Sequence, residues 1–161
     1  MSVVIREYRD DDVTSMMDMW NEVVREGNAF PQKEPLSYEE AKTFFASQSF
    51  TGVAEKDGVP VGLYILHPNN VGRCGHLSNA SYAVKSGLRG LRIGERLVRH
   101  SLEKAKELGF RVLQFNAVVK TNHCAVHLYE KLGFTKLGTV PQGFLMKDGT
   151  YEDIVLFYYS L

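Results

Sequence analysis

The sequence has no excess of either charge and no long apolar run. Its 161 residues hold 19 Lys and Arg against 19 Asp and Glu, so the formal net charge at pH 7 is zero. Proteins that coat nucleic acid usually carry a basic excess, so this balance argues against that class and leaves only a local basic patch open. The chain has no run of 18 apolar residues, so we expect no membrane-spanning segment.

Cysteines are also scarce. The two thiols, Cys74 and Cys124, show no Cys-x-x-Cys spacing, and such usage is typical of a reducing compartment. The start of the chain turns acidic at residues 10–12, where a secretory signal would continue apolar. We therefore expect a cytoplasmic protein without membrane contact.

Length and composition predict one globular domain, residues 1–161. The length is close to the roughly 150 residues of a typical domain. The chain is 44% hydrophobic and 24% charged, which is ordinary for a globular protein and argues against disorder. No internal repeat, linker or low-complexity tract interrupts it.

Hydrophobic periodicity predicts a chain in which strands and helices are mixed. Asp57-Gly58 between two apolar runs predicts a tight hairpin, and Ser37 with Glu40 predicts a capped helix start. Strands are expected at residues 3–8, 50–55, 59–66, 77–84, 112–119, 135–140 and 151–159, and helices at residues 13–24, after 37, at 94–108 and at 122–132. The order predicts an α/β (α+β) fold.

Residues 84–95, between a predicted strand and a predicted helix, carry the clearest chemistry. Glycines there allow close approach of a ligand, and the helix start offers free N–H groups to an anion. The pattern suits a phosphate or pyrophosphate, and the alternative is an ordinary turn with solvated arginines. It fits neither the P-loop nor G-x-G-x-x-G. The glycines are Gly87, Gly90 and Gly94, and the arginines are Arg89, Arg92 and Arg96.

Three motifs, in order and at the expected spacing, resemble the GCN5-related N-acetyltransferase (GNAT) family. They are Val84-x4-Arg89-Gly90-x-x-Ile93-Gly94, Asn122-x6-Tyr129-Glu-Lys-Leu-Gly-Phe134, and Lys147-x-Gly149-x-Tyr151-x-Asp153. The last is similar to the tail of amino-acid acetyltransferases of the phosphinothricin type. The resemblance covers nearly the whole chain and implies a mixed, mostly antiparallel sheet with a splayed parallel strand pair, flanked by helices.

The resemblance implies acetyl-CoA as co-substrate, held between the strands at 77–84 and 112–119. The backbone of Val84 would pair with the pantetheine arm, and Asn122 would contact it, although an Asn there can also serve only as a helix cap. Backbone N–H groups of the loop would hold the pyrophosphate, from Arg89, Gly90, Leu91, Arg92, Ile93, Gly94 and Glu95.

Arg92 departs from the family pattern, which commonly has glycine at this place. If the backbone there requires a positive φ, an arginine is strained. Alternatively, its guanidinium pairs directly with the pyrophosphate, which is the reading we favour.

For catalysis, the resemblance places Tyr129 near the CoA sulfur, where a phenol could protonate the departing thiolate. Without the motif, Tyr129 would be read as a core aromatic. The strand at 77–84 offers no carboxylate as general base, and His76 is the titratable candidate beside it.

The asparagines suggest the acceptor. Asn79 and Asn116, on the two splayed strands, resemble a subgroup that acts on proline analogues and related amino acids. We expect them in the substrate site, with a possible part in catalysis; the alternative is satisfied polar positions in an irregular sheet. His76 and Phe30 are further substrate-site candidates, with Phe30 at the pocket wall.

His123-x3-His127 lacks the Glu of a metalloprotease motif, so no metal is expected. The sequence thus predicts an acyltransferase that moves acetyl from acetyl-CoA to the amine of a small molecule, an amino acid or an analogue. Alternatives are acetylation of a protein N-terminus or lysine, and an acyl-CoA-binding module without catalysis. No nucleic-acid partner is expected, and a homodimer is compatible with family habit.

Overall fold

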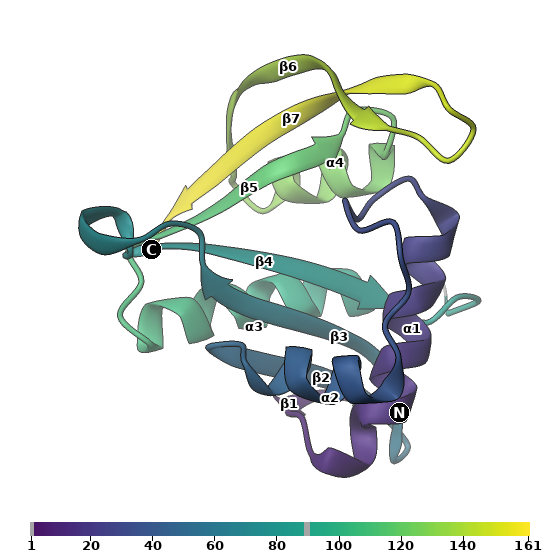
Figure 1. Cartoon of the computed structure of the whole chain (residues 1–161). Coiled ribbons are helices and arrows are strands. Elements are labelled where there is room, and N and C mark those ends of the chain that lie inside the picture. The colour runs from purple at the N-terminus through teal and green to yellow at the C-terminus, as the bar shows by residue number, and fades with distance from the viewer. Residues whose placement is uncertain (1, 89–90) are drawn as a thin grey trace.

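The computed structural model describes residues 2–88 and 91–161 (Figure 1). Its strands are β1 (Val3–Glu7), β2 (Phe50–Lys56), β3 (Val59–Pro68), β4 (Leu77–Val84), β5 (Val112–Val119), β6 (Thr135–Leu145) and β7 (Tyr151–Ser160). Its helices are α1 (Val13–Glu26), α2 (Tyr38–Ala46), α3 (Ile93–Glu107) and α4 (His123–Lys131). No helix in these residues is long and apolar enough to cross a membrane.

The strands form one sheet in the order β1-β2-β3-β4-β5-β7-β6. Every neighbouring pair is antiparallel except β4 and β5, which run parallel. The predicted mixed, mostly antiparallel fold with one parallel pair is therefore confirmed.

The parallel pair opens almost as soon as it forms. Leu77 pairs with Val112 and Ser78 with Leu113, and no further pairs follow. Asn79 Nδ2 donates to the Gln114 carbonyl at 2.8 Å, so a side-chain hydrogen bond stands where the next backbone hydrogen bond between the strands would be. In Figure 1, β4 and β5 start together near the C-terminus and diverge toward α1. The divergence leaves an opening in the middle of the sheet.

Helices cover the two faces of the sheet. Alternation along β3 places Leu63 and Ile65 in the core with α1 and α2, and Tyr64 and Leu66 in the core with α3. On the α3 face, the Tyr64 hydroxyl lies 2.8 Å from His100 Nδ1. Helices α1 and α2 therefore lie on one face of the sheet beside the opening, and α3 and α4 lie on the other.

The element order matches the one expected from periodicity, and most boundaries agree within two residues. The exception is β6, which was expected to end at residue 140 and continues to Leu145. Register shifts after Lys136 and after Val140 absorb the irregular residues, and Gln142 takes a φ of 52°. Because β6 is an edge strand, Pro141 costs it no ladder bond on its free side.

Candidate active site

A cleft of about 870 Å³ lies at the opening between β4 and β5. Its walls come from residues 29–32, α2, β3, β4, the start of α3, β5 and α4. Among the described residues that line it, none is Asp, Glu, Lys or Arg. The titratable lining side chains are His67, Tyr82, Cys124 and Tyr129. The described lining therefore holds no carboxylate, lysine or arginine, although the protein is rich in both signs of charge.

The start of α3 borders this cleft. Gly94 lines it, and a Cβ added there would approach Leu128 and Val84 only to 4.0 Å. Arg92 precedes the helix with a φ of 55°, so the positive φ considered for this position is present. Ile93 is buried in the core, and Leu91 is half-buried against it. Arg89 and Gly90 lie outside the described residues.

Glu95 does not line the cleft. Its carboxylate accepts from Lys131 Nζ at 2.7 Å and from Arg99 Nε at 3.2 Å. These two hydrogen bonds, the Lys131 bond first, lower the pKa of Glu95 below its ordinary value. The side chain therefore links the first turn of α3 to the last turn of α4.

Val84 and Asn122 both line the cleft, at the carboxyl end of β4 and the start of α4. Asn122 Oδ1 accepts from the backbone N–H of Ala125 at 3.3 Å, so the side chain does cap α4. Its Nδ2 donors are not used in that cap. The cap and a contact with a ligand are therefore compatible.

Tyr129 lies in an aromatic cluster on the α4 side of the opening. Its ring centroid is 4.3 Å from that of Phe115 and 5.4 Å from that of Phe134. Burial raises the pKa of the Tyr129 hydroxyl well above its ordinary value. The side chain is only half-buried and lines the cleft, so it is both a cluster aromatic and a cleft residue. It stays protonated throughout the physiological pH range.

Asn79 and Asn116 line the cleft from the two diverging strands. Asn116 Oδ1 accepts from Asn69 Nδ2 at 3.3 Å and from Gln114 Nε2 at 3.2 Å, while its Nδ2 donates to Asn69 Oδ1. An amide offers two acceptor sites and two donors, so one N–H of Asn116 is left for a ligand. The contacts of Asn116 with Asn69 and Gln114 were not foreseen, and the one with Asn69 joins residues that are far apart in the sequence.

Phe30 lines the cleft from the segment between α1 and α2, and its ring centroid is 4.3 Å from that of Trp20. Two contacts hold this segment in place. The buried Asn21 bonds both the N–H and the carbonyl of Leu36 at 2.7 and 2.9 Å. The Lys147 N–H donates to the Gly27 carbonyl at 3.3 Å, which joins the segment to the β6–β7 turn.

His76 is not brought into the cleft. It precedes β4 instead of lying on it, its side chain is exposed, and its carbonyl accepts from the N–H of Arg111 at 3.0 Å. It therefore lies at the closed end of the strand pair. The histidine that does line the cleft is His67 on β3, which sequence patterns did not single out.

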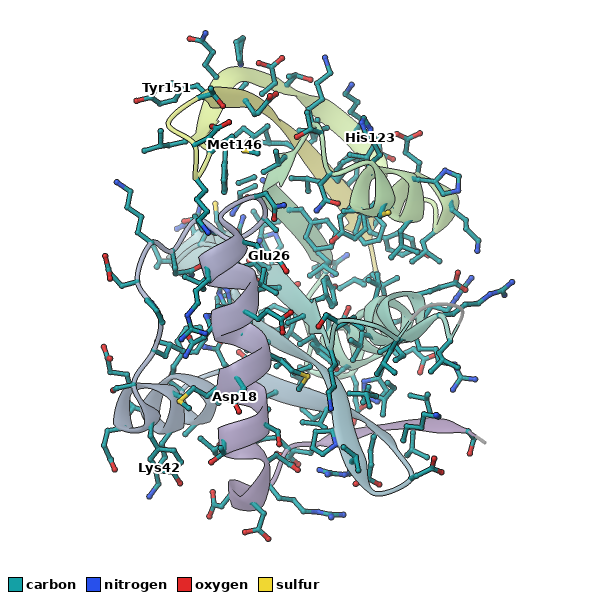
Figure 2. All side chains as sticks on the ribbon, turned by 90° about the vertical axis from the view of Figure 1, so that its right-hand side faces the viewer. Asp18, Glu26, Lys42, His123, Met146 and Tyr151 are labelled. Carbon is teal, nitrogen blue, oxygen red and sulfur yellow. The ribbon has the colours of Figure 1, made fainter. Side chains whose placement is uncertain are left out.

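A second, smaller cavity of about 490 Å³ adjoins the cleft at the open end of the strand pair. It shares Tyr82, Val84 and Asn122 with the cleft. Figure 2 looks toward this end, where Glu26 at the end of α1, Met146 and His123 border the cavity. Glu26 is the one carboxylate among the described residues that line either space.

Comparison with known proteins agrees with this architecture. N-acetyltransferase aca1 of Schizosaccharomyces pombe is 33% identical over 100 residues, which is 62% of this chain and 48% of that protein. The chain thus spans about half the length of this curated relative. A GCN5-related N-acetyltransferase from Kribbella flavida has 32% identity and a TM-score of 0.91 over 99% of this chain and 98% of that one.

A phosphinothricin acetyltransferase from Sinorhizobium meliloti, solved in complex with acetyl-CoA, has a TM-score of 0.92 at 22% identity, over 100% of this chain and 89% of that one. At that identity, the likeness concerns the fold. The sequence pattern of the Acetyltransferase (GNAT) family matches residues 14–134, three quarters of the chain and most of the cleft-lining residues. The family predicted from the three motifs is confirmed: this chain belongs to the acetyltransferase (GNAT) family.

Proposed function

We propose that the protein is an acetyl-CoA-dependent N-acetyltransferase that acts by direct transfer on the amine of a small molecule, an amino acid or an amino-acid analogue. One observation carries the proposal: the cleft lies where β4 and β5 separate and is lined by residues from both faces of the sheet. Tyr129 lies on the α4 side, and Asn79 shares the α1–α2 face with Ala83 by strand alternation. Donor and acceptor can therefore approach the opening from opposite faces.

The residues at the start of α3 fit a CoA donor. Gly94 presents backbone to the cleft, the first N–H groups of α3 lack helical partners, and Arg92 adds a positive charge beside them. The free edge of β4 around Val84 can pair with the pantetheine amides, and Asn122 has free donors beside it. The full set in this proposal is Val84, Arg89, Gly90, Leu91, Arg92, Ile93, Gly94, Glu95, Asn122 and Tyr129.

The acceptor side favours a small molecule over a protein segment. Phe30 covers it from a segment fastened at Asn21 and at Lys147, which supports a bounded pocket rather than an open groove. The lining is made of aromatic groups and amides, with Asn79 and Asn116 available to orient an amine or a carboxylate. Similarity in fold to phosphinothricin acetyltransferases is compatible with an amino-acid-like acceptor.

Tyr129 serves as the acid in this proposal. Its hydroxyl remains protonated because burial raises its pKa, and it lies on the side of the opening that faces α3 and α4. When the C–S bond breaks, the hydroxyl donates its proton to the leaving sulfur and recovers one from solvent. Proton transfer of this kind contributes about 10²- to 10⁴-fold to a rate.

The test is a thiol-release assay with acetyl-CoA and a panel of amino acids, proline analogues, phosphinothricin, simple amines and peptides. Tyr129→Phe should lower kcat about 10²-fold while leaving the Kd for CoA nearly unchanged. Tyr151→Phe is the matched control, because Tyr151 is exposed on β7 and does not line the cleft. Turnover of peptides alone, or of nothing in the panel despite CoA binding, would contradict the proposal.

A further inference from the structure

An amine acceptor needs a base in this cleft, and this requirement rests on the proposed function. An aliphatic amine is almost fully protonated at neutral pH, and only its neutral form attacks a carbonyl. No Asp or Glu is present among the described residues that line the cleft. Of the titratable lining groups, Tyr82 and Tyr129 have pKa values raised by burial, which leaves neither as a base near neutral pH. His67 and Cys124 remain.

His67 is oriented for this task by its own strand. Its Nδ1 lies 2.9 Å from the carbonyl oxygen of Pro68. A carbonyl oxygen can only accept, so Nδ1 carries the hydrogen and Nε2 has a free lone pair. This contact favours the tautomer with the hydrogen on Nδ1 and needs no carboxylate.

The sheet register places His67 on the acceptor face. It continues the stripe of Leu63 and Ile65, which pack with α1 and α2, and it lies directly opposite Asn79 on β4. Directly opposed side chains in an antiparallel pair have Cβ atoms about 5 Å apart. The imidazole therefore lies beside the amide that spans the opening, on the face opposite Tyr129.

We propose that His67 is the general base of the reaction, accepting a proton from the acceptor ammonium at Nε2, directly or through one water. The neutral amine then forms its N–C bond to the acetyl carbon, and the C–S bond breaks. The acceptor nitrogen loses two protons: the first leaves through His67 to solvent, and the second leaves to solvent once the N–C bond has formed. Tyr129 gives its proton to sulfur and recovers one from solvent. The products are the amide, free CoA thiol and one released proton.

The competitors are Cys124, which also lines the cleft, and Glu26, in the adjoining cavity. His67→Gln should lower kcat/KM about 10²-fold at neutral pH with the best acceptor of the panel, while the KM for acetyl-CoA stays within its error. The deficit should shrink at alkaline pH, and with methoxyamine, whose nitrogen is already neutral. The matched control is His127→Gln, since His127 is exposed on α4 and does not line the cleft.

The pH profile separates the candidates. The acidic limb of kcat/KM should move in His67→Gln to the higher pH at which the acceptor ammonium loses its proton by itself, and it should stay in place in Glu26→Gln and in Cys124→Ser. The reverse result, or an unmoved limb in His67→Gln, overturns the proposal. The other titratable groups of the cleft are Cys124, Tyr82 and Tyr129, and the lining side chains of α2, β4 and residues 29–32 are uncharged. His67→Asn is a second variant of the same position, and thermal melts of both variants show whether each one is folded.

A second measurement needs no turnover. Imidazole ¹⁵N spectra of the full-length protein, with His67 assigned by comparison with His67→Gln, should show a protonated Nδ1 and a bare Nε2 at mildly alkaline pH. A proton on Nε2 overturns the proposal. A wild-type protein that acetylates nothing contradicts the proposed function instead, and the ¹⁵N result still decides whether His67 has the orientation that a base requires.

Discussion

Gly94→Ala separates ligand binding from stability at the start of α3. Gly94 is the second residue of the helix, and an added Cβ would contact Leu128 and Val84 only at 4.0 Å, an ordinary van der Waals distance. Its φ is not positive, so alanine is unstrained there. Because alanine is favoured over glycine in a helix by up to about 1 kcal/mol, the variant should be as stable as the wild type or slightly more stable.

Binding of CoA should nevertheless weaken. Gly94 lines the cleft, so the new methyl group stands on the surface that the proposed donor contacts. Forcing one extra carbon into a fitted contact costs about 1–3 kcal/mol, which corresponds to a rise in Kd of about five- to 150-fold.

Isothermal titration with CoA gives the Kd, and denaturant unfolding gives the free energy of unfolding. Gly138→Ala is the matched control, because a Cβ there meets nothing within 4 Å and the residue lies on β6, outside the cleft. A folded Gly94→Ala protein with the wild-type Kd would refute the view that the donor rests on this backbone. Loss of stability would refute the packing argument.

Two further substitutions test the cleft walls. Arg92→Gly removes an arginine at a φ of 55°, so the free energy of unfolding should rise by about 1 kcal/mol. The Kd for CoA should also rise, and an unchanged Kd would show that the guanidinium makes no contact with the pyrophosphate. Asn21→Ala leaves the N–H and carbonyl of Leu36 without their partner, at a cost of about 1–3 kcal/mol in denaturant unfolding. It should also raise the KM of the acceptor more than that of acetyl-CoA, and equal rises would contradict a role of residues 27–37 on the acceptor side only.

Local sequence signals predicted the elements well because each rests on chemistry within a few residues. Asp57 and Gly58 both have positive φ, 52° and 78°, as the predicted hairpin requires. Ser37 and Glu40 form the predicted capping box. The end of β6 was missed because two register shifts carry the strand past Pro141, and such shifts depend on the partner strand β7.

Prediction from local sequence was less successful for the cleft residues, because they come together through pairing between strands. His76 was the candidate because it adjoins β4 in sequence, and His67 was not considered; the register of β3 against β4 brings His67 opposite Asn79. Pairing across strands is a long-range property, and a one-residue slip would turn every side chain to the other face. The motifs located the donor end of the cleft, but no local pattern locates a residue contributed by a neighbouring strand.

Asn79 and Asn116 can stabilise the irregular sheet and still bind a substrate, so these two interpretations are compatible. Where β4 and β5 separate, backbone groups lose their ladder partners, and Asn79 supplies a donor to Gln114 while Asn116 bonds to Asn69. Amides can satisfy such groups without bringing charge into the opening, so the same side chains that stabilise the split also keep the cleft neutral. A neutral cleft leaves proton transfer to the few titratable groups beside it. The chemistry of the site therefore depends on the place where β4 and β5 stop pairing.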